Sequence, residues 1–157
     1  MLIVDDDVRS IFALTSVLER HGLCVHYAEN GDDAVTFLEQ RGDIEVIVID
    51  VMAPAVDGPK TIVQIRRTPK ASGMPIIALA PGGVLGSQEP AAEAGASDCV
   101  SMPVNPDVLL PLLRRWMDES ADAREAAARE APDEAKGPRR EMPMEDSRLQ
   151  PPQLPHP

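Results

Sequence analysis

The most informative part of the sequence is I-E-V-I-V-I-D-V-M-A-P-A-V-D-G, residues 44–58. It begins with a nearly unbroken apolar run, which stops at a carboxylate, Asp50. A short run of β-branched residues without polar alternation is typical of a strand buried on both faces, as in a parallel sheet covered by helices. In open α/β sheets, ligands bind at the carboxyl ends of the strands. Asp50 is therefore either a reactive group at such an edge or a cap of the following turn, and this stretch alone favours neither.

Strand-like and helix-like patterns alternate along the rest of the chain. Apolar residues at spacings of three and four predict the helices, and Gly, Pro or Asn near their ends predict where they begin and stop. The patterns predict strands at 1–4, 23–28, 46–50, 75–79 and 99–101, and helices at 8–21, 32–40, 59–68, 87–94 and from 106 onward. Five alternations indicate an α/β fold with a parallel sheet and helices on both faces. We expect a flavodoxin-like (βα)5 doubly wound sandwich of strand order 2-1-3-4-5.

That strand order brings carboxylates together at one edge of the sheet. The first and third strands lie side by side, and they end at Asp5-Asp6-Asp7 and at Asp50. Converging carboxylates repel one another, and a cation among them relieves the repulsion. Hard oxygen ligands with room for water suit Mg²⁺. With Mg²⁺ bound, a carboxylate can act as a nucleophile toward phosphorus.

Composition narrows the classes of function. The chain is 43% hydrophobic but only 3% aromatic, so its core must be aliphatic. A net charge of −11 argues against nucleic acid and anionic membranes as partners. Cys24 and Cys99 are far apart in apolar contexts, and we expect buried free thiols. The N-terminus carries no basic-then-apolar signal segment, so we expect a soluble protein of the cytoplasm.

The composition changes after Met117. Residues 118–157 hold seven prolines, ten acids and six bases, with few large aliphatic residues. We therefore divide the chain into a folded domain at 1–117 and a low-complexity acidic, Pro-rich tail at 118–157. Residues 118–130 are rich in Ala, Glu and Arg and can extend the last helix into solvent. From Pro132 onward we expect disorder, because too little apolar surface is available to offset the ordering entropy.

Three motifs in order resemble the response-regulator receiver domain of two-component signalling. They are L-I-V-D-D-D at 2–7, I-D-V-M-A-P-A-V-D-G at 49–58 and G-A-S-D-C-V-S-M-P-V-N-P at 95–106. The likeness runs from Met1 to about Trp116. It implies a CheY-like phosphorelay protein whose partner is a histidine kinase or a histidine phosphotransfer protein. It also implies no enzymatic activity beyond self-phosphorylation and dephosphorylation.

The resemblance assigns roles to particular residues. It implies that Asp50 is the phosphoacceptor and that Asp5 and Asp6 hold Mg²⁺ together with it. The backbone carbonyl of Met52 would complete the protein's ligands. Asp7 would begin a helix and would not be a ligand. The resemblance further implies a cis peptide bond before Pro103.

The sequence departs from the family pattern at four positions. Ala80 stands where the family has Thr or Ser, and Met102 where it has Lys. Cys99 replaces the usual switch aromatic, and Ala53 replaces the usual Met. Ser101 cannot substitute for the lost Lys, because adjacent strand residues point to opposite faces. Hydrogen bonds to a charged group are each worth roughly 1.5–3 kcal/mol, and a near-complete two-state switch needs roughly 5.5 kcal/mol. We therefore expect the metal site to be kept and the phosphorylation switch to be weakened.

Two alternative functions remain. The domain could be a pseudo-receiver, an interaction module that is indifferent to phosphorylation. The pattern Asp5-x-Asp7 is also found in phosphohydrolases of the haloacid dehalogenase type. Those enzymes need a downstream Lys and a later acidic pair that the sequence does not supply, and Asp50 would then have no role. A flavin or dinucleotide site is disfavoured because carboxylates replace a Gly-rich loop after the first strand.

Overall fold

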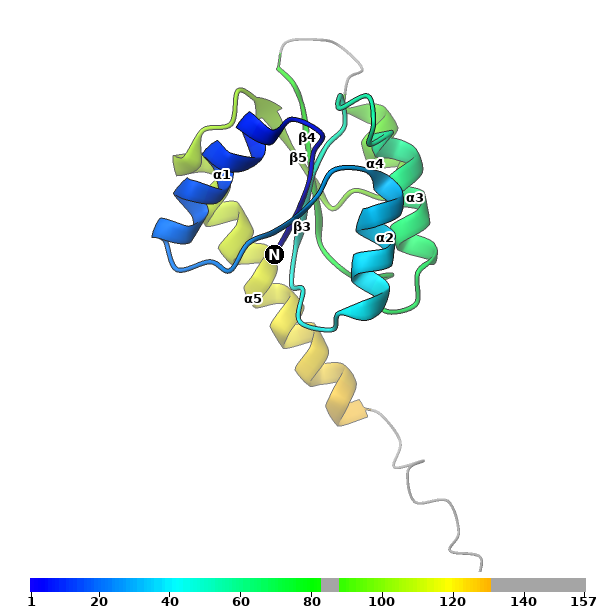
Figure 1. Cartoon of the computed structure of the whole chain (residues 1–157). Coiled ribbons are helices and arrows are strands. Elements are labelled where there is room, and N and C mark those ends of the chain that lie inside the picture. Colours follow the sequence, from blue (N-terminus) through cyan, green and yellow to red (C-terminus); the bar gives the residue numbers. More distant parts are fainter. Residues whose placement is uncertain (83–87, 131–157) are drawn as a thin grey trace, which may run out of the picture.

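The computed structural model describes residues 1–82 and 88–130, and it forms a parallel sheet with helices on both sides (Figure 1). The strands are β1 (Leu2–Val4), β2 (His26–Ala28), β3 (Ile47–Asp50), β4 (Ile76–Pro81) and β5 (Asp98–Met102). The helices are α1 (Val8–Arg20), α2 (Gly31–Gln40), α3 (Gly58–Arg67), α4 (Glu89–Ala94) and α5 (Pro106–Glu130). The start of the helix predicted at 87–94 and the disorder predicted from Pro132 onward lie outside the described residues.

The order of the strands confirms the predicted flavodoxin-like topology. All four pairings are parallel, and the order is β2-β1-β3-β4-β5. Val4 lies opposite Ile49, and Asp50 lies opposite Leu79. Because β1 and β3 are neighbours at the centre, the loops that follow them meet at one edge of the sheet.

The sheet separates two hydrophobic cores. Side chains alternate between the faces of a strand, so neighbouring residues contribute to different cores. One core joins Leu2, Val4, Ile47, Ile49, Ile76 and Ala78 to α2, α3 and α4 through Leu38, Ile62, Ile65 and Ala91. The other joins Ile3, Val48, Ile77, Leu79 and Val100 to α1 and α5 through Ile11, Leu18, Leu109 and Leu113. Figure 1 accordingly places α1 and α5 on one side of the sheet and α2, α3 and α4 on the other.

The second strand is shorter than predicted, and this corrects one expectation about cysteine. β2 begins at His26, which lies opposite Leu2, the first residue of β1. Residues 23–25 therefore lie opposite no residue of β1. Cys24 is a free thiol, as expected, but it is exposed rather than buried. Apolar neighbours in the sequence did not reveal that this segment precedes the paired part of the strand.

The last helix continues past the sheet. α5 crosses Met117 without interruption and extends to Glu130, which confirms the predicted helical start of the 118–157 segment (Figure 1). Its first turns are held in the core by Leu109 and Leu113. Its outer part is exposed where its side chains are described, and it is rich in the helix formers Ala, Glu and Arg. Among the described residues, no helix combines the length and the apolar character needed to cross a bilayer.

A single arginine ties α3 to the segments that precede β4 and β5. The Arg66 guanidinium donates to the carbonyls of Gly95, Ser72 and Met74 and to Ser97 Oγ, in five hydrogen bonds of 2.6–3.2 Å. These acceptors are all neutral, and burial lowers the pKa of Arg66. A planar fork of N–H donors can meet this many acceptors at once, which a lysine ammonium cannot.

We predict that Arg66→Ala lowers the free energy of unfolding by about 2–3 kcal/mol, because several carbonyls lose a charged donor. Arg67→Ala is the matched control, since Arg67 is exposed on the next position of the same helix. Urea unfolding followed by circular dichroism measures both changes. Equal effects of the two substitutions would show that the guanidinium contacts carry no stability.

Candidate functional site

Three consecutive carboxylates form the loop between β1 and α1. Asp5 is only 3% exposed, and its backbone N–H continues the sheet by donating to the Ala28 carbonyl at 3.1 Å. Asp5 Oδ1 accepts a hydrogen bond from the Asp7 N–H at 3.0 Å. Asp7 is the N-cap of α1 and accepts from the Arg9 N–H at 3.0 Å. The expectation that Asp7 begins a helix is therefore confirmed.

Asp50 ends β3 and faces the same edge. Its Oδ1 accepts a hydrogen bond from the Met52 N–H at 2.9 Å. The loop that follows is joined to the first loop, because the Ala55 N–H donates to Asp6 Oδ2 at 3.0 Å. Gly58 is required where this loop enters α3: a Cβ there would lie 2.6 Å from Val51 Cα. The loop geometry therefore holds Asp50 and Asp6 on adjoining segments.

The pKa of Asp5 is raised, in part because other carboxylates lie near it. Burial raises the pKa of Asp5, and the negative charges of Asp50, Asp6 and Asp7 raise it further, while the hydrogen bond from the Asp7 N–H opposes them. The ion pairs that the structure describes, Arg41–Asp43 and Arg115–Glu119, involve none of these residues. Among the described residues, the positive charge of Arg9 acts on Asp7, but no ion pair involves Asp5, Asp6 or Asp50.

The donor set suits a hard divalent cation. Asp5, Asp6 and Asp50 each use one carboxylate oxygen for a backbone N–H, and the other oxygen accepts no hydrogen bond from the described residues. Oxygen donors of this kind, with water completing the shell, are those that Mg²⁺ prefers. Within residues 1–82 and 88–130, however, no three His, Cys, Asp or Glu side chains converge as a finished metal cluster. The match between this site and Mg²⁺ therefore rests on the carboxylate oxygens and on the negative charges around Asp5.

Two positions of the site, Ala80 and Met102, carry apolar side chains where the resembled family has a hydroxyl and an ammonium. Ala80 follows Leu79, the residue opposite Asp50, and it is fully buried. Met102 ends β5 and packs against the core on the α1 and α5 side. Neither side chain can donate a hydrogen bond to an anion at Asp50. The Met102–Pro103 peptide bond is cis, as the resemblance implied.

The neighbours of Met102 point the other way. Cys99 packs against the core on the opposite face of the sheet, and burial raises the pKa of its thiol. Ser101 Oγ lies 3.4 Å from Gln88 Nε2, whose segment leads into α4. Because side chains alternate along a strand, Ser101 lies on the same face of β5 as Cys99 and on the opposite face from Met102. Ala53, the fourth departure, is buried in the core on the α2 and α3 side.

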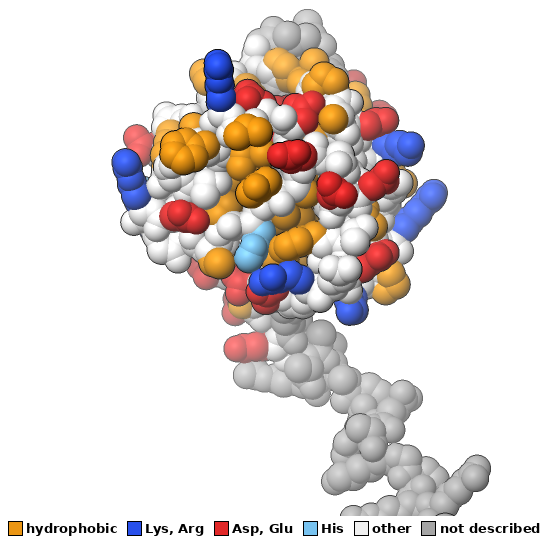
Figure 2. All heavy atoms as spheres, viewed as in Figure 1, with side chains coloured by type: hydrophobic (Ala, Val, Ile, Leu, Met, Phe, Trp, Pro, Cys, Tyr) orange, Lys and Arg blue, Asp and Glu red, His pale blue; other side chains and the backbone are white. Residues whose placement is uncertain are grey.

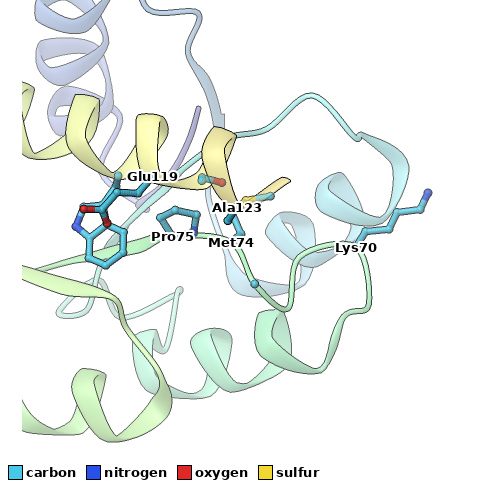
Figure 3. A pocket seen from close by; sticks show the side chains of 8 residues that line it. Lys70, Met74, Pro75, Glu119 and Ala123 are labelled. Carbon is cyan, nitrogen blue, oxygen red and sulfur yellow. The ribbon is translucent and has the colours of Figure 1, made fainter. Parts of the chain in front are cut away.

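Sequence reasoning missed a pocket beside the carboxylates. It has a volume of about 260 Å³ and is lined by Asp5, Ser10, Ala13, Leu14, Val17, Leu79, Met102, Pro103, Val104 and Pro106. A larger pocket of about 480 Å³ lies far from Asp50, between α5 and the segment before β4. Figure 3 shows Met74 and Pro75 close to Ala123 there, with the Lys70 side chain extending away from them. No local sequence signal marks either pocket, since each is formed by segments distant along the chain.

Comparison with known proteins gives a family match. The family described as the response regulator receiver domain matches residues 1–114. Protein PilH of Pseudomonas aeruginosa is 31% identical over 110 residues, which cover 70% of this chain and 90% of PilH. The chain spans about half the length of other curated relatives, with 51% and 48% of two transcriptional regulatory proteins covered.

Solved structures agree with this match. The receiver domain of sensor histidine kinase PA1611 of P. aeruginosa, with a magnesium ion in its active site cleft, superposes with a TM-score of 0.69 at 27% identity, covering 74% of this chain and 95% of that one. The complex of the Saccharomyces cerevisiae phosphotransfer protein Ypd1 with the receiver domain of Ssk1 matches with a TM-score of 0.66 at 28% identity, covering 73% and 86%.

We predict that Asp5→Asn raises the stability of the metal-free protein at neutral pH. Because the pKa of Asp5 is higher in the folded than in the unfolded state, its ionisation opposes folding as the pH rises between those two values. The gain should disappear at pH values below the unfolded pKa, where both states are protonated. Urea unfolding in EDTA at several pH values measures it.

The control for this prediction is Asp7→Asn. The Arg9 N–H and the Ser10 hydroxyl lower the pKa of Asp7, so its ionised form favours folding above the unfolded pKa. Asp7→Asn should therefore give no gain at neutral pH. A loss of stability in Asp5→Asn at neutral pH would contradict the crowding argument.

Proposed function

Because this chain belongs to the response regulator receiver domain family, we propose that it works in two-component signalling by accepting a phosphoryl group at Asp50. One observation carries the proposal. Asp50 ends the central strand β3, next to the buried Asp5, and its negative charge raises the pKa of Asp5. A carboxylate in this place is both close to metal-binding oxygens and open to a donor from solvent.

The residues of the site divide the chemistry between them. Asp5, Asp6, Asp50 and the backbone carbonyl of Met52 would hold Mg²⁺, which would neutralise charge on the phosphoryl oxygens. The Met52 N–H holds Asp50 Oδ1, which leaves Oδ2 as the oxygen that can attack phosphorus. A P–O bond forms to Oδ2 as the bond from phosphorus to the donor breaks, and the donor leaves with the electron pair.

The proposed donor is a phosphohistidine of a histidine kinase or phosphotransfer protein. Support comes from the relatives, which include a kinase receiver domain and a receiver in complex with a phosphotransfer protein. Large apolar side chains stay exposed close to the carboxylates: Val8 and Phe12 on α1 are 65% and 73% exposed, and Met52 is 61% exposed. Figure 2 shows acidic and hydrophobic side chains together near the top of the domain, the end at which β1 and β3 finish. Such a surface suits a protein partner.

We further propose that phosphorylation switches this domain only weakly. Ala80 and Met102 provide no hydroxyl and no ammonium to pull toward a phosphoryl group. Charge-assisted hydrogen bonds are the strong contacts at such a site, and the bias between two loop states depends on them. A module that binds its partner regardless of phosphorylation is the second candidate, and the same two apolar residues favour it.

We expect acetyl phosphate with Mg²⁺ to add one phosphoryl group to the wild-type chain but none to Asp50→Asn. Intact-mass spectrometry and Phos-tag electrophoresis measure the modification. Asp57→Asn is the matched control, since Asp57 lies in the same loop and at φ 46° occupies a conformation that Asn tolerates. Modification of Asp50→Asn to the wild-type extent would remove Asp50 as the acceptor, and an unmodified wild type would favour the second candidate.

We expect the double substitution Ala80→Thr, Met102→Lys to strengthen the response to phosphorylation. Each restored donor adds a contact worth about 1.5–3 kcal/mol to the phosphorylated state. Amide chemical shifts of β4 and β5 before and after phosphorylation measure the response, which should be small in the wild type and large in the double variant. Ala80→Thr, Ser101→Lys is the control, because Ser101 faces away from Met102. Large shifts in the phosphorylated wild type would refute the weak switch.

A further inference from the structure

Where α5 extends beyond the sheet, one face of the helix lines the pocket of about 480 Å³ (Figure 3). Four positions of α5 contribute to the lining at spacings of three and four, which place them on one helix face: Trp116, Glu119, Ser120 and Ala123. Across from them, Met74 and Pro75 are buried in the segment before β4. The volume falls within the range of about 300–1,000 Å³ that is usual for ligand pockets.

The pocket combines apolar side chains with a carboxylate at its edge. Trp116 is half-buried, and its Nε1 donates to Asp98 Oδ2 at 3.4 Å, which orients the indole beside Met74 and Pro75. Glu119 is exposed, and its Oε1 accepts a hydrogen bond from Arg115 Nε at 3.2 Å. Its Oε2 accepts no hydrogen bond from the described residues.

The lysine of the lining does not neutralise this carboxylate. The Lys70 ammonium donates to the Glu39 carbonyl at 2.9 Å, and Figure 3 shows its side chain extending away from Glu119. The pocket therefore presents an indole, a thioether and a proline ring next to negative charge.

These features suit a proline-rich peptide that carries one basic residue. Proline-rich segments bind grooves lined by aromatic side chains, and they lose little conformational entropy because each proline ring fixes its φ angle. A guanidinium next to the prolines can reach the open carboxylate oxygen of Glu119 in a charge-assisted hydrogen bond. An acidic peptide would be repelled by the same carboxylate.

The chain itself contains such a segment after α5. Residues 148–155 read R-L-Q-P-P-Q-L-P, with one arginine, three prolines and no acid. Every acidic residue of the stretch 131–157 precedes Arg148. Leu149 and Leu154 add apolar surface on either side of the first two prolines. The charge and the apolar character of this segment thus complement those of the pocket.

The length of the chain allows this segment to return to the pocket. α5 ends at Glu130, which lies about 21 Å beyond Trp116 at the helical rise of about 1.5 Å per residue. Residues 131–147 come between Glu130 and the segment, and an extended chain of that length spans up to about 56 Å. A tether longer than the span gives an effective concentration on the order of 1 mM, so a weak contact is sufficient.

We propose that residues 148–155 bind in this pocket of the same molecule, with the prolines against Trp116 and Arg148 at Glu119. The pocket lies at the end of the sheet opposite Asp50, because Pro75 precedes β4 whereas Asp50 ends the parallel strand β3. The interaction therefore needs neither Mg²⁺ nor a phosphoryl group, and it is independent of the function proposed above. The bound segment closes this face of α5 to other proteins.

The test uses Trp116, the only tryptophan of the chain, as its reporter. Acrylamide quenching of its fluorescence is measured on the full chain in EDTA. The double substitution Leu149→Asp, Leu154→Asp should raise the quenching constant about twofold or more, because about half or more of the wild-type molecules are closed when the effective concentration equals the dissociation constant. Met142→Asp, Met144→Asp makes the same change of charge outside the segment and should match the wild type.

A charge exchange tests the contact between Arg148 and Glu119. Arg148→Glu and Glu119→Arg should each raise the quenching constant, and the two together should lower it again, since opposite charges then face each other with the signs reversed. Equal quenching of the wild type and the Leu149→Asp, Leu154→Asp variant, or no recovery in the exchanged pair, would overturn the proposal. So would protection that grows with protein concentration, because the segment would then bind a second copy of the chain.

Discussion

Repulsion among carboxylates at the ends of two paired strands is the constraint on which this structure depends. Parallel pairing sets Val4 opposite Ile49, so that the residues that follow, Asp5 and Asp50, are brought to the same edge. The charges of Asp50, Asp6 and Asp7 raise the pKa of Asp5, and water screens this repulsion only in part because Asp5 is buried. One oxygen of each carboxylate accepts a hydrogen bond from a backbone N–H. The donors are Asp7 for Asp5, Met52 for Asp50 and Ala55 for Asp6. The loops after β1 and β3 therefore supply the hydrogen bonds that partly stabilise these carboxylates.

The surroundings of the carboxylates differ from one side to the other. Exposed apolar side chains, Val8 and Met52, lie next to the carboxylates in the loops, whereas Asp5 shares a pocket lining with Leu79 and Met102. An apolar wall lowers the local dielectric and strengthens the interaction with any cation that arrives. The carboxylates supply negative charge and oxygen donors, whereas Ala80 and Met102 supply no side-chain hydrogen-bond donor beside them. Acceptance and readout of a phosphoryl group depend on different side chains, and the weak switch proposed above rests on that separation.

Most of the fold follows from local patterns. Apolar runs predicted the five strands of the described residues, and spacings of three and four with Gly, Pro or Asn near the ends predicted their five helices. The helix formers after Met117 predicted the extension of α5. The exception is residues 23–25, which look like strand but precede the residues of β2 that pair with β1. Burial of Cys24 was wrong for the same reason. Pairing depends on a second segment, and a local pattern contains no information about where that segment begins.

The sequence by itself determined the order of elements, the aliphatic cores and the identity of the residues at the carboxyl ends of β1, β3, β4 and β5. These depend on periodicity and residue type, which are local. The tertiary structure decided that Ala55 holds Asp6 across 49 residues, that Arg66 joins three segments, and that a pocket opens beside Asp5. It also decided which face Met102 takes. Each of these contacts joins segments that only folding brings together, so no stretch of sequence could contain it.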